Sequence, residues 1–143
     1  APTPTTNATT AGSADTAEFF GSCDGQPRPT APVGSLSPDL RDIGAVVTAI
    51  DAALDQAHKA WLRCFTIDEE LLSTTHFSLG RWLRNSLHLT QRPDLLRALG
   101  AKSPDEASDI IILVYAAHLR GQTLSVAEAA KRSQATIDAW KKP

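Results

Sequence analysis

Hydrophobic residues recur every three or four positions from Leu40 onward, which is the period of an α-helix. No window alternates between apolar and polar residues for long, so strands are not expected. The first stripe predicts a helix that is opened by Ser37 and Pro38 and continues, after a bend, through Trp61 and Leu62. Its apolar members are Leu40, Ile43, Val46, Val47, Ile50, Ala53, Leu54 and Ala57.

Capping residues predict where the next helices begin and end. Thr66, followed three residues later by Glu69, is a capping box that predicts a short helix through Leu72. A longer helix is expected from about Thr74 to Leu89. A short one is expected over Pro93–Gly100, because proline favours a helix start and glycine a helix end.

The strongest start signal is Ser103-Pro104-Asp105-Glu106, which combines an N-cap, a first-turn proline and a glutamate at the third position. The helix that follows runs to Arg120 and is apolar on nearly all sides, so it is expected at the centre of the fold. Ser125 and Glu128 cap a last helix that passes through Ala130, Ile137 and Trp140. These elements predict an all-α fold: a compact irregular bundle of five to seven helices with a central helix near 104–120.

The chain divides into a tail and a helical domain. Residues 1–37 are rich in threonine, alanine and proline, and the first sixteen carry almost no large apolar group, so they are expected to be flexible. Residues 38–143 are expected to form the helical domain.

The charge is nearly balanced at −2, but it is unevenly distributed. Residues 1–75 hold ten acids and four bases, whereas residues 76–143 hold six acids and ten bases. The basic excess is spread over many positions, and a nucleic-acid-binding stripe is therefore not expected. The longest apolar run, Ile110–Ala117, is far too short to span a membrane.

The N-terminal sequence Ala-Pro-Thr-Pro resembles a mature end left after removal of a signal peptide, although a shortened expression product would look the same. Cys23 and Cys64 support export, because an even number of cysteines in an exported chain suggests a disulfide. The alternative is two reduced thiols. The expected location is the periplasm or outside the cell, and a membrane anchor linked through the tail is possible.

The segment His76–Asn85 concentrates aromatic and basic residues around one glycine. Gly80 costs a helix about 1 kcal/mol relative to alanine, so we expect another helix to approach it closely, with Ala116–Ala117 as the candidate. Leu79, Trp82 and Leu83 share one arc and are predicted to face the core.

Phe77, Arg81, Arg84 and His88 lie near a second arc of the same predicted helix. The two arginines could bind a carboxylate or phosphate, or they could pair with acids of the N-terminal half. His76, expected in the first turn of this helix, could act as a base or as a donor to a partner, or could contact nearby backbone. Asn85 is expected to bond a neighbouring loop.

No recognisable catalytic or cofactor motif is present. No serine sits on a strand-to-helix elbow, and the sequence contains no glycine-rich phosphate loop or dinucleotide fingerprint. The cysteines and histidines lack the spacing of a zinc site. We therefore expect no cofactor and no metal, and favour a protein that is not an enzyme.

The segment His76–Asn85 resembles the His-Phe-Gly-Leu-Gly-x-Trp-x-Arg-Asn signature of an uncharacterised bacterial family of helical domains. A second similar piece, Ser103–Ile111, opens the long helix, and the resemblance covers about residues 66–121. The chain departs from the pattern at Ser78, where members have glycine, and at Ser86–His88. The resemblance implies a compact helical domain and no established reaction.

The export-like features and the lack of a catalytic set favour a small exported binding protein, in particular a periplasmic immunity-type inhibitor of a secreted antibacterial toxin. Its expected contact residues are Asp68, Glu69 and Glu70 with the Ser73–His76 turn, together with Arg81 and Arg84. One alternative is a cell-envelope enzyme or sugar-binding domain with a His/Arg cleft. Another is a structural or adaptor domain of the envelope.

Overall fold

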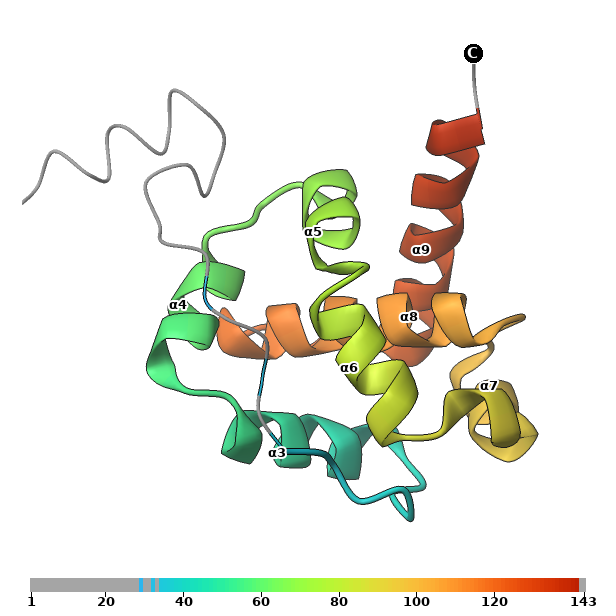
Figure 1. Cartoon of the computed structure of the whole chain (residues 1–143). Coiled ribbons are helices and arrows are strands. Elements are labelled where there is room, and N and C mark those ends of the chain that lie inside the picture. The colour runs from blue at the N-terminus through green and yellow to red at the C-terminus, as the bar shows by residue number, and fades with distance from the viewer. Residues whose placement is uncertain (1–28, 30–31, 33, 142–143) are drawn as a thin grey trace, which may run out of the picture.

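Seven α-helices and one short 3-10 helix follow one another in the computed structural model, which describes residues 29, 32 and 34–141 (Figure 1). The described residues contain no strand, so the all-α prediction is confirmed. The helices are α3 Ile43–Ala53, α4 Gln56–Arg63, α5 Asp68–Thr75, α6 Leu79–Ser86, η1 Leu89–Gln91, α7 Pro93–Leu99, α8 Pro104–Leu119 and α9 Val126–Lys141.

Helix α8 is the centre of the fold, as its apolar sequence predicted. Every residue from Glu106 to Ala117 is buried, because each of the other seven helical segments packs against α8 (Figure 1). Although α8 is strongly apolar, no helix in the described part of the chain is long and apolar enough to cross a membrane.

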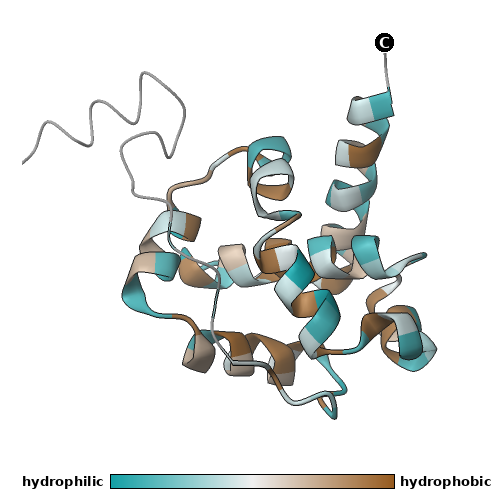
Figure 2. Cartoon of the chain, viewed as in Figure 1, coloured by the Kyte–Doolittle hydropathy of each residue, from teal (hydrophilic) through white to brown (hydrophobic). Residues whose placement is uncertain are grey.

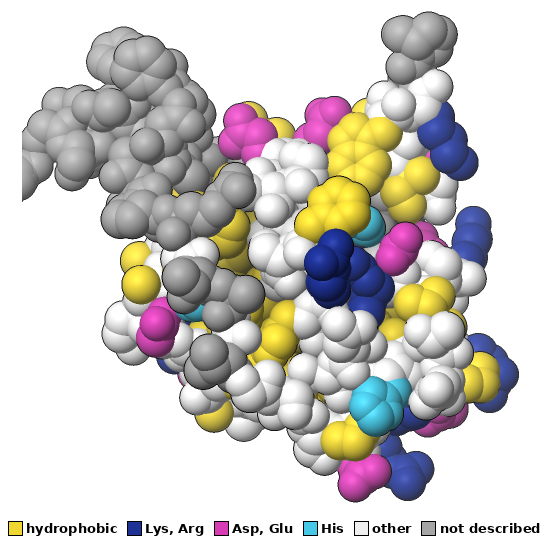
Figure 3. Space-filling view, in the orientation of Figure 1, with side chains coloured by type: hydrophobic (Ala, Val, Ile, Leu, Met, Phe, Trp, Pro, Cys, Tyr) yellow, Lys and Arg dark blue, Asp and Glu magenta, His cyan; other side chains and the backbone are white. Residues whose placement is uncertain are grey.

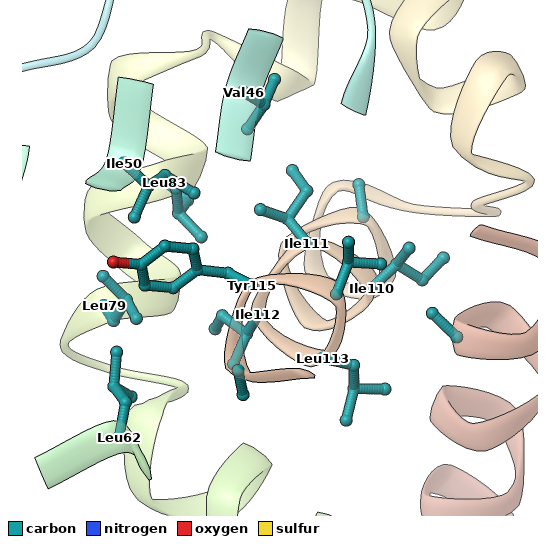
Figure 4. Close-up of a cluster of buried hydrophobic side chains, with 14 of the residues drawn as sticks. Val46, Ile50, Leu62, Leu79, Leu83, Ile110, Ile111, Ile112, Leu113 and Tyr115 are labelled. Atoms are coloured by element: carbon teal, nitrogen blue, oxygen red, sulfur yellow. The ribbon is translucent and has the colours of Figure 1, made fainter. Parts of the chain in front are cut away.

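The surrounding helices turn their apolar sides toward α8 and their polar sides outward (Figure 2). Val46 and Ile50 of α3 and Leu83 of α6 are at most 1 % exposed. Figure 4 shows them gathered around the isoleucines of α8. Burial of this kind supplies most of the stability of helices that are too short to persist alone.

Local caps fix the later helices where the sequence predicted them. The Ser103 hydroxyl accepts a hydrogen bond from the Glu106 amide at 3.1 Å, and the Glu106 carboxylate accepts one from the Lys102 amide at 2.7 Å. The Ser125 hydroxyl likewise accepts from the Glu128 amide at 3.1 Å. Gly100 ends α7 in the left-handed region at φ 69°.

The first helix starts later than predicted. It begins at Ile43 rather than at Pro38, because the Asp42 carboxylate accepts from the Ala45 amide at 2.8 Å and caps the helix there. The expected bend comes earlier, since Asp55 caps a new helix by accepting from the His58 amide at 2.9 Å.

Two further predictions around α5 are wrong. The Thr66–Glu69 capping box does not form: Ile67 is the N-cap, without a side-chain hydrogen bond, and α5 begins at Asp68. The predicted Thr74–Leu89 helix is broken, because the Ser78 amide donates to the Thr75 carbonyl at 3.1 Å and closes a turn over residues 76–78. Only Leu79–Ser86 remains helical as α6.

The segment before α3 packs on the helical body from residue 34 onward. Leu36 is buried in the core, and the Trp82 indole donates to the Gly34 carbonyl at 2.9 Å. The Arg92 guanidinium donates to the Pro38 carbonyl, and to the Leu40 carbonyl at 3.0 Å. Cys23 and most of the tail that was predicted to be flexible lie outside the described residues. The disulfide that involves Cys23 and the flexibility of that part of the tail therefore remain predictions.

Candidate functional site

The turn between α5 and α6 gathers several of the predicted site residues. His76 is the C-cap of α5, and not a first-turn residue of the next helix as predicted. Phe77 follows it with 71 % of its surface exposed. The His76 and Phe77 rings meet edge to face, with centroids 4.7 Å apart. The Arg81 guanidinium lies over the Phe77 ring, 5.7 Å from its centroid, so a cation and an aromatic ring share this surface.

Arg84, by contrast, points into the fold. Its Nη1 donates to Ser108 Oγ at 3.0 Å and its Nη2 to the His76 carbonyl at 2.9 Å, while Nε lies 3.4 Å from Asp105 Oδ1. The side chain is only 15 % exposed. These contacts tie the α5–α6 turn to the start of α8. Arg84 therefore forms an ion pair within the chain, as one alternative held, but with an acid of the C-terminal half.

Gly80 makes room for this arginine. A Cβ atom at position 80 would lie 3.0 Å from Arg84 Nη1, 3.2 Å from the Thr75 carbonyl oxygen and 3.7 Å from Ser108 Oγ. The prediction of a closely approaching helix is right, because that helix is α8. The contact is with Ser108, near the start of α8, and not with Ala116–Ala117.

We expect Gly80→Ala to destabilise the protein by about 1–2 kcal/mol, although alanine is the better helix former. The added methyl group would press on a backbone carbonyl and on a guanidinium held by hydrogen bonds, so neither neighbour can yield freely. Urea denaturation of both proteins measures the change. A variant as stable as the parent would show that the turn adapts.

Asp109 is a buried acid that the sequence analysis did not single out. It is 4 % exposed, and its Oδ1 atom has no hydrogen-bond partner. The pKa of this carboxyl is raised to about 7, chiefly by burial; Arg84 acts to lower the pKa, and the charges of Asp105 and Glu106 act to raise it. Its burial could have been inferred from the sequence, because Asp109 directly precedes the longest apolar run of the chain.

The acidic cluster Asp68–Glu70 lies in the first turn of α5, at the opposite end of the helix from His76. Asp68 forms an ion pair with another residue of the same chain. Its carboxylate accepts from Arg132 Nε at 2.8 Å and from Nη2 at 2.5 Å, and this contact raises the pKa of Arg132. Glu69 is exposed and Glu70 is half-buried. The structure therefore does not bring the acids and the His76 turn together as one cluster.

Two adjoining cavities lie at the C-terminal end of α6, whereas the turn precedes its N-terminal end. The smaller, of about 220 Å³, is lined by Arg84, Asn85, His88, Thr90 and Gln91. The larger, of about 440 Å³, is lined by Gly34, Ser35, Leu36, Pro38, Trp82, Asn85, Ser86 and His88. Both share Asn85 and His88, so we treat them as one site and call it the Asn85 groove.

The structure around the groove bears on three of the predictions made from the sequence. Trp82 packs against the core as predicted, but it is only half-buried and also forms part of the groove wall. Asn85, which was expected to bond a neighbouring loop, is exposed and lines the groove opposite residues 34–38. His76 and Arg81 line neither of these two cavities, so the expected His/Arg cleft is not formed there. Within the described residues, no group of three acidic, histidine or cysteine side chains could hold a metal ion.

Comparison with known proteins places the chain by family. A family model described as "Domain of unknown function (DUF6794)" matches residues 41–119, which cover the helices from α3 to α8. This agrees with the resemblance to an uncharacterised family, and the match extends further toward the N-terminus. Neither the curated proteins nor the solved structures contain a match to the chain.

Proposed function

Because the chain belongs to the DUF6794 family, whose function is unknown, we propose a function from its own surface: a small binding protein that docks onto another protein through the turn between α5 and α6. The observation that carries the proposal is Phe77, which is 71 % exposed on a turn that the structure holds in place. Large aromatic residues beside arginine are typical of the few positions that dominate binding energy.

The turn is held from both sides. The His76 carbonyl accepts from Arg84, and the Thr75 carbonyl accepts from the Ser78 amide at 3.1 Å. A side chain presented by a fixed backbone loses less entropy on binding than one presented by a mobile loop. Figure 3 shows Lys and Arg side chains beside exposed hydrophobic side chains on this side of the molecule. A partner that fits has an apolar pocket with a carboxylate at its rim to meet Arg81.

In its finer form, the proposal is that the partner is a secreted antibacterial toxin and that this protein is an immunity-type inhibitor in the periplasm or outside the cell. The supporting features are the Thr-, Ala- and Pro-rich composition of residues 1–37 and the two cysteines. Cys64 lies half-buried at the C-cap of α4, and Cys23 lies outside the described residues. A disulfide between them belongs to the same proposal, and thiol titration of the unfolded, unreduced protein tests it.

We expect Phe77→Ala to weaken binding by about 30-fold while leaving the fold intact, because the side chain has little contact with the core. The partner is first isolated with the tagged protein from a native envelope extract or with the product of a neighbouring gene, and is identified by mass spectrometry. Its dissociation constant is then measured by calorimetry with the parent and with each variant.

Ile67→Ala is the matched control, since Ile67 is also apolar and is 52 % exposed, but lies at the N-cap of α5 beside the acidic cluster. We expect its affinity to equal that of the parent. Loss of binding in Ile67→Ala with normal binding in Phe77→Ala would place the interface at the acidic end of α5 and contradict the proposal.

Inhibition of the isolated partner's activity by this protein tests the finer proposal. Loss of a catalytic activity in a folded His76→Ala variant would favour the enzyme alternative.

A further inference from the structure

The Asn85 groove is a formed site rather than a loose gap between segments. Its outer wall, residues 34–38, is attached to the body through the burial of Leu36 and through the bond from the Trp82 indole to the Gly34 carbonyl. Arg92 secures the same wall by donating to the Pro38 carbonyl. The larger cavity, about 440 Å³, falls within the range of roughly 300–1,000 Å³ that small-molecule sites occupy.

Apart from Arg84, the polar side chains that line the groove are amides, hydroxyls and one imidazole. Asn85 and Gln91 offer amides, His88 an imidazole, and Ser86 and Thr90 hydroxyls. Each of these groups can both donate and accept a hydrogen bond. No lining residue is acidic, and a pair of catalytic carboxylates is therefore absent from the groove.

The single charged residue of the groove does not suit an anion. Arg84 lines the smaller cavity, but its three guanidinium nitrogens are directed at Ser108, the His76 carbonyl and Asp105. A phosphate or carboxylate in the groove would thus have to compete with these contacts. The lining favours an uncharged ligand with many hydroxyl groups.

We infer that the Asn85 groove binds a neutral saccharide. Sugar hydroxyls both donate and accept, and the amides, imidazole and hydroxyls of the groove match them in kind. A sugar ring also has an apolar face of C–H groups, for which Trp82, Leu36 and Pro38 provide apolar surface in the larger cavity. The site lies apart from Phe77 and does not depend on the proposed protein partner.

The backbone of His88 supports a functional reason for the groove. His88 is the one residue other than glycine, among those the structure describes, with a positive φ, at 53°. Glycine would adopt this left-handed conformation at lower cost. The strained backbone instead places an imidazole at the junction of the two cavities, which is the position that contacts a ligand in either of them.

The test is an NMR titration of the ¹⁵N-labelled full chain with two neutral trisaccharides, chitotriose and maltotriose. We expect at least one of them to give saturable shifts at the Trp82 indole and at the Asn85 and His88 amides. Inorganic phosphate is the charged comparison and is expected to leave these signals unchanged. The absence of a saturable shift with either sugar, or the same shifts with phosphate, would overturn the inference.

Variants locate the binding. Asn85→Ala should weaken saccharide binding by about tenfold or more, through loss of a hydrogen-bonding amide. Gln56→Ala removes an exposed amide from α4; Gln56 lines neither cavity, so this variant should bind as the parent does. His88→Gly keeps the left-handed backbone, so it should lose affinity while its melting temperature stays equal or rises. Unchanged affinity in both Asn85→Ala and His88→Gly contradicts a site in the groove.

Discussion

Arg84→Ala should destabilise the protein by about 3 kcal/mol, because charged hydrogen bonds and buried groups left without partners are both costly to lose. The substitution leaves the His76 carbonyl without its guanidinium donor and removes the cation nearest to Asp105 and Asp109. The Ser108 hydroxyl is less affected, since it also donates to the Asp105 carbonyl at 2.8 Å. The free energy of unfolding, from urea denaturation at pH 7, measures the loss.

Two variants separate the role of Arg84 from the effect of its charge. Arg81→Ala is the matched control, since Arg81 is on the same helix but is exposed and lies over the exposed Phe77 ring; we expect a change within about 0.5 kcal/mol. Arg84→Lys keeps the charge but cannot reach the carbonyl, the hydroxyl and the carboxylate together, so we expect a loss between those of the other two variants. Equal stability of Arg84→Ala and Arg81→Ala would show that the contacts of Arg84 contribute nothing.

The segment His76–Asn85 reads as one motif in the sequence, but the structure divides it among three tasks. Gly80 and Arg84 join the α5–α6 turn to α8. Phe77 and Arg81 lie on the outer surface of that turn. Trp82 and Asn85 face the groove. Helical periodicity alone could not make this division, because it places Arg81 and Arg84 on neighbouring positions of one face although only Arg84 is drawn inward.

The sequence predicted those features of the fold that have local causes. Ser103, Ser125 and Gly100 act within their own helix ends, so the bounds of α7, α8 and α9 could be inferred from neighbouring residues. The break between α5 and α6 has a tertiary component, since Arg84 donates to the His76 carbonyl from eight residues away. No residue type at position 76 indicates that its backbone oxygen, rather than its imidazole, holds the turn.

The site was harder to predict than the fold for the same reason. Asp68 was predicted to contact a protein partner, but its carboxylate accepts hydrogen bonds from Arg132 of α9. The groove depends on residues 34–38 lying against α6, a contact between segments almost fifty positions apart in the sequence. Asp109 is buried because other helices cover α8, and the apolar run that follows it is the only local feature that separates it from the exposed Asp105.

Asp109 should make the protein less stable as the pH rises from about 4 to about 7. Its pKa is about 7 in the folded protein, against an ordinary value of 3.8. Below pH 4 the carboxyl is protonated in both the folded and the unfolded chain. Between these values the unfolded chain releases the proton and the folded one retains it, which favours unfolding; above pH 7 the loss is complete. A shift of this size corresponds to about 4 kcal/mol.

Asp109→Asn removes this titration while keeping the shape of the side chain. We expect the variant to exceed the parent in free energy of unfolding by about 2–4 kcal/mol at pH 8, and to differ little from it at pH 4. Other carboxyls also change stability in acid, among them Asp55 and Asp94, whose pKa values are lowered by hydrogen bonds to His58 and Arg92 respectively. Their contribution is common to both proteins, so the difference between parent and variant at each pH isolates Asp109. A difference that does not change with pH would mean that Asp109 ionises as freely in the folded protein as in the unfolded chain, and that its burial in α8 carries no electrostatic cost.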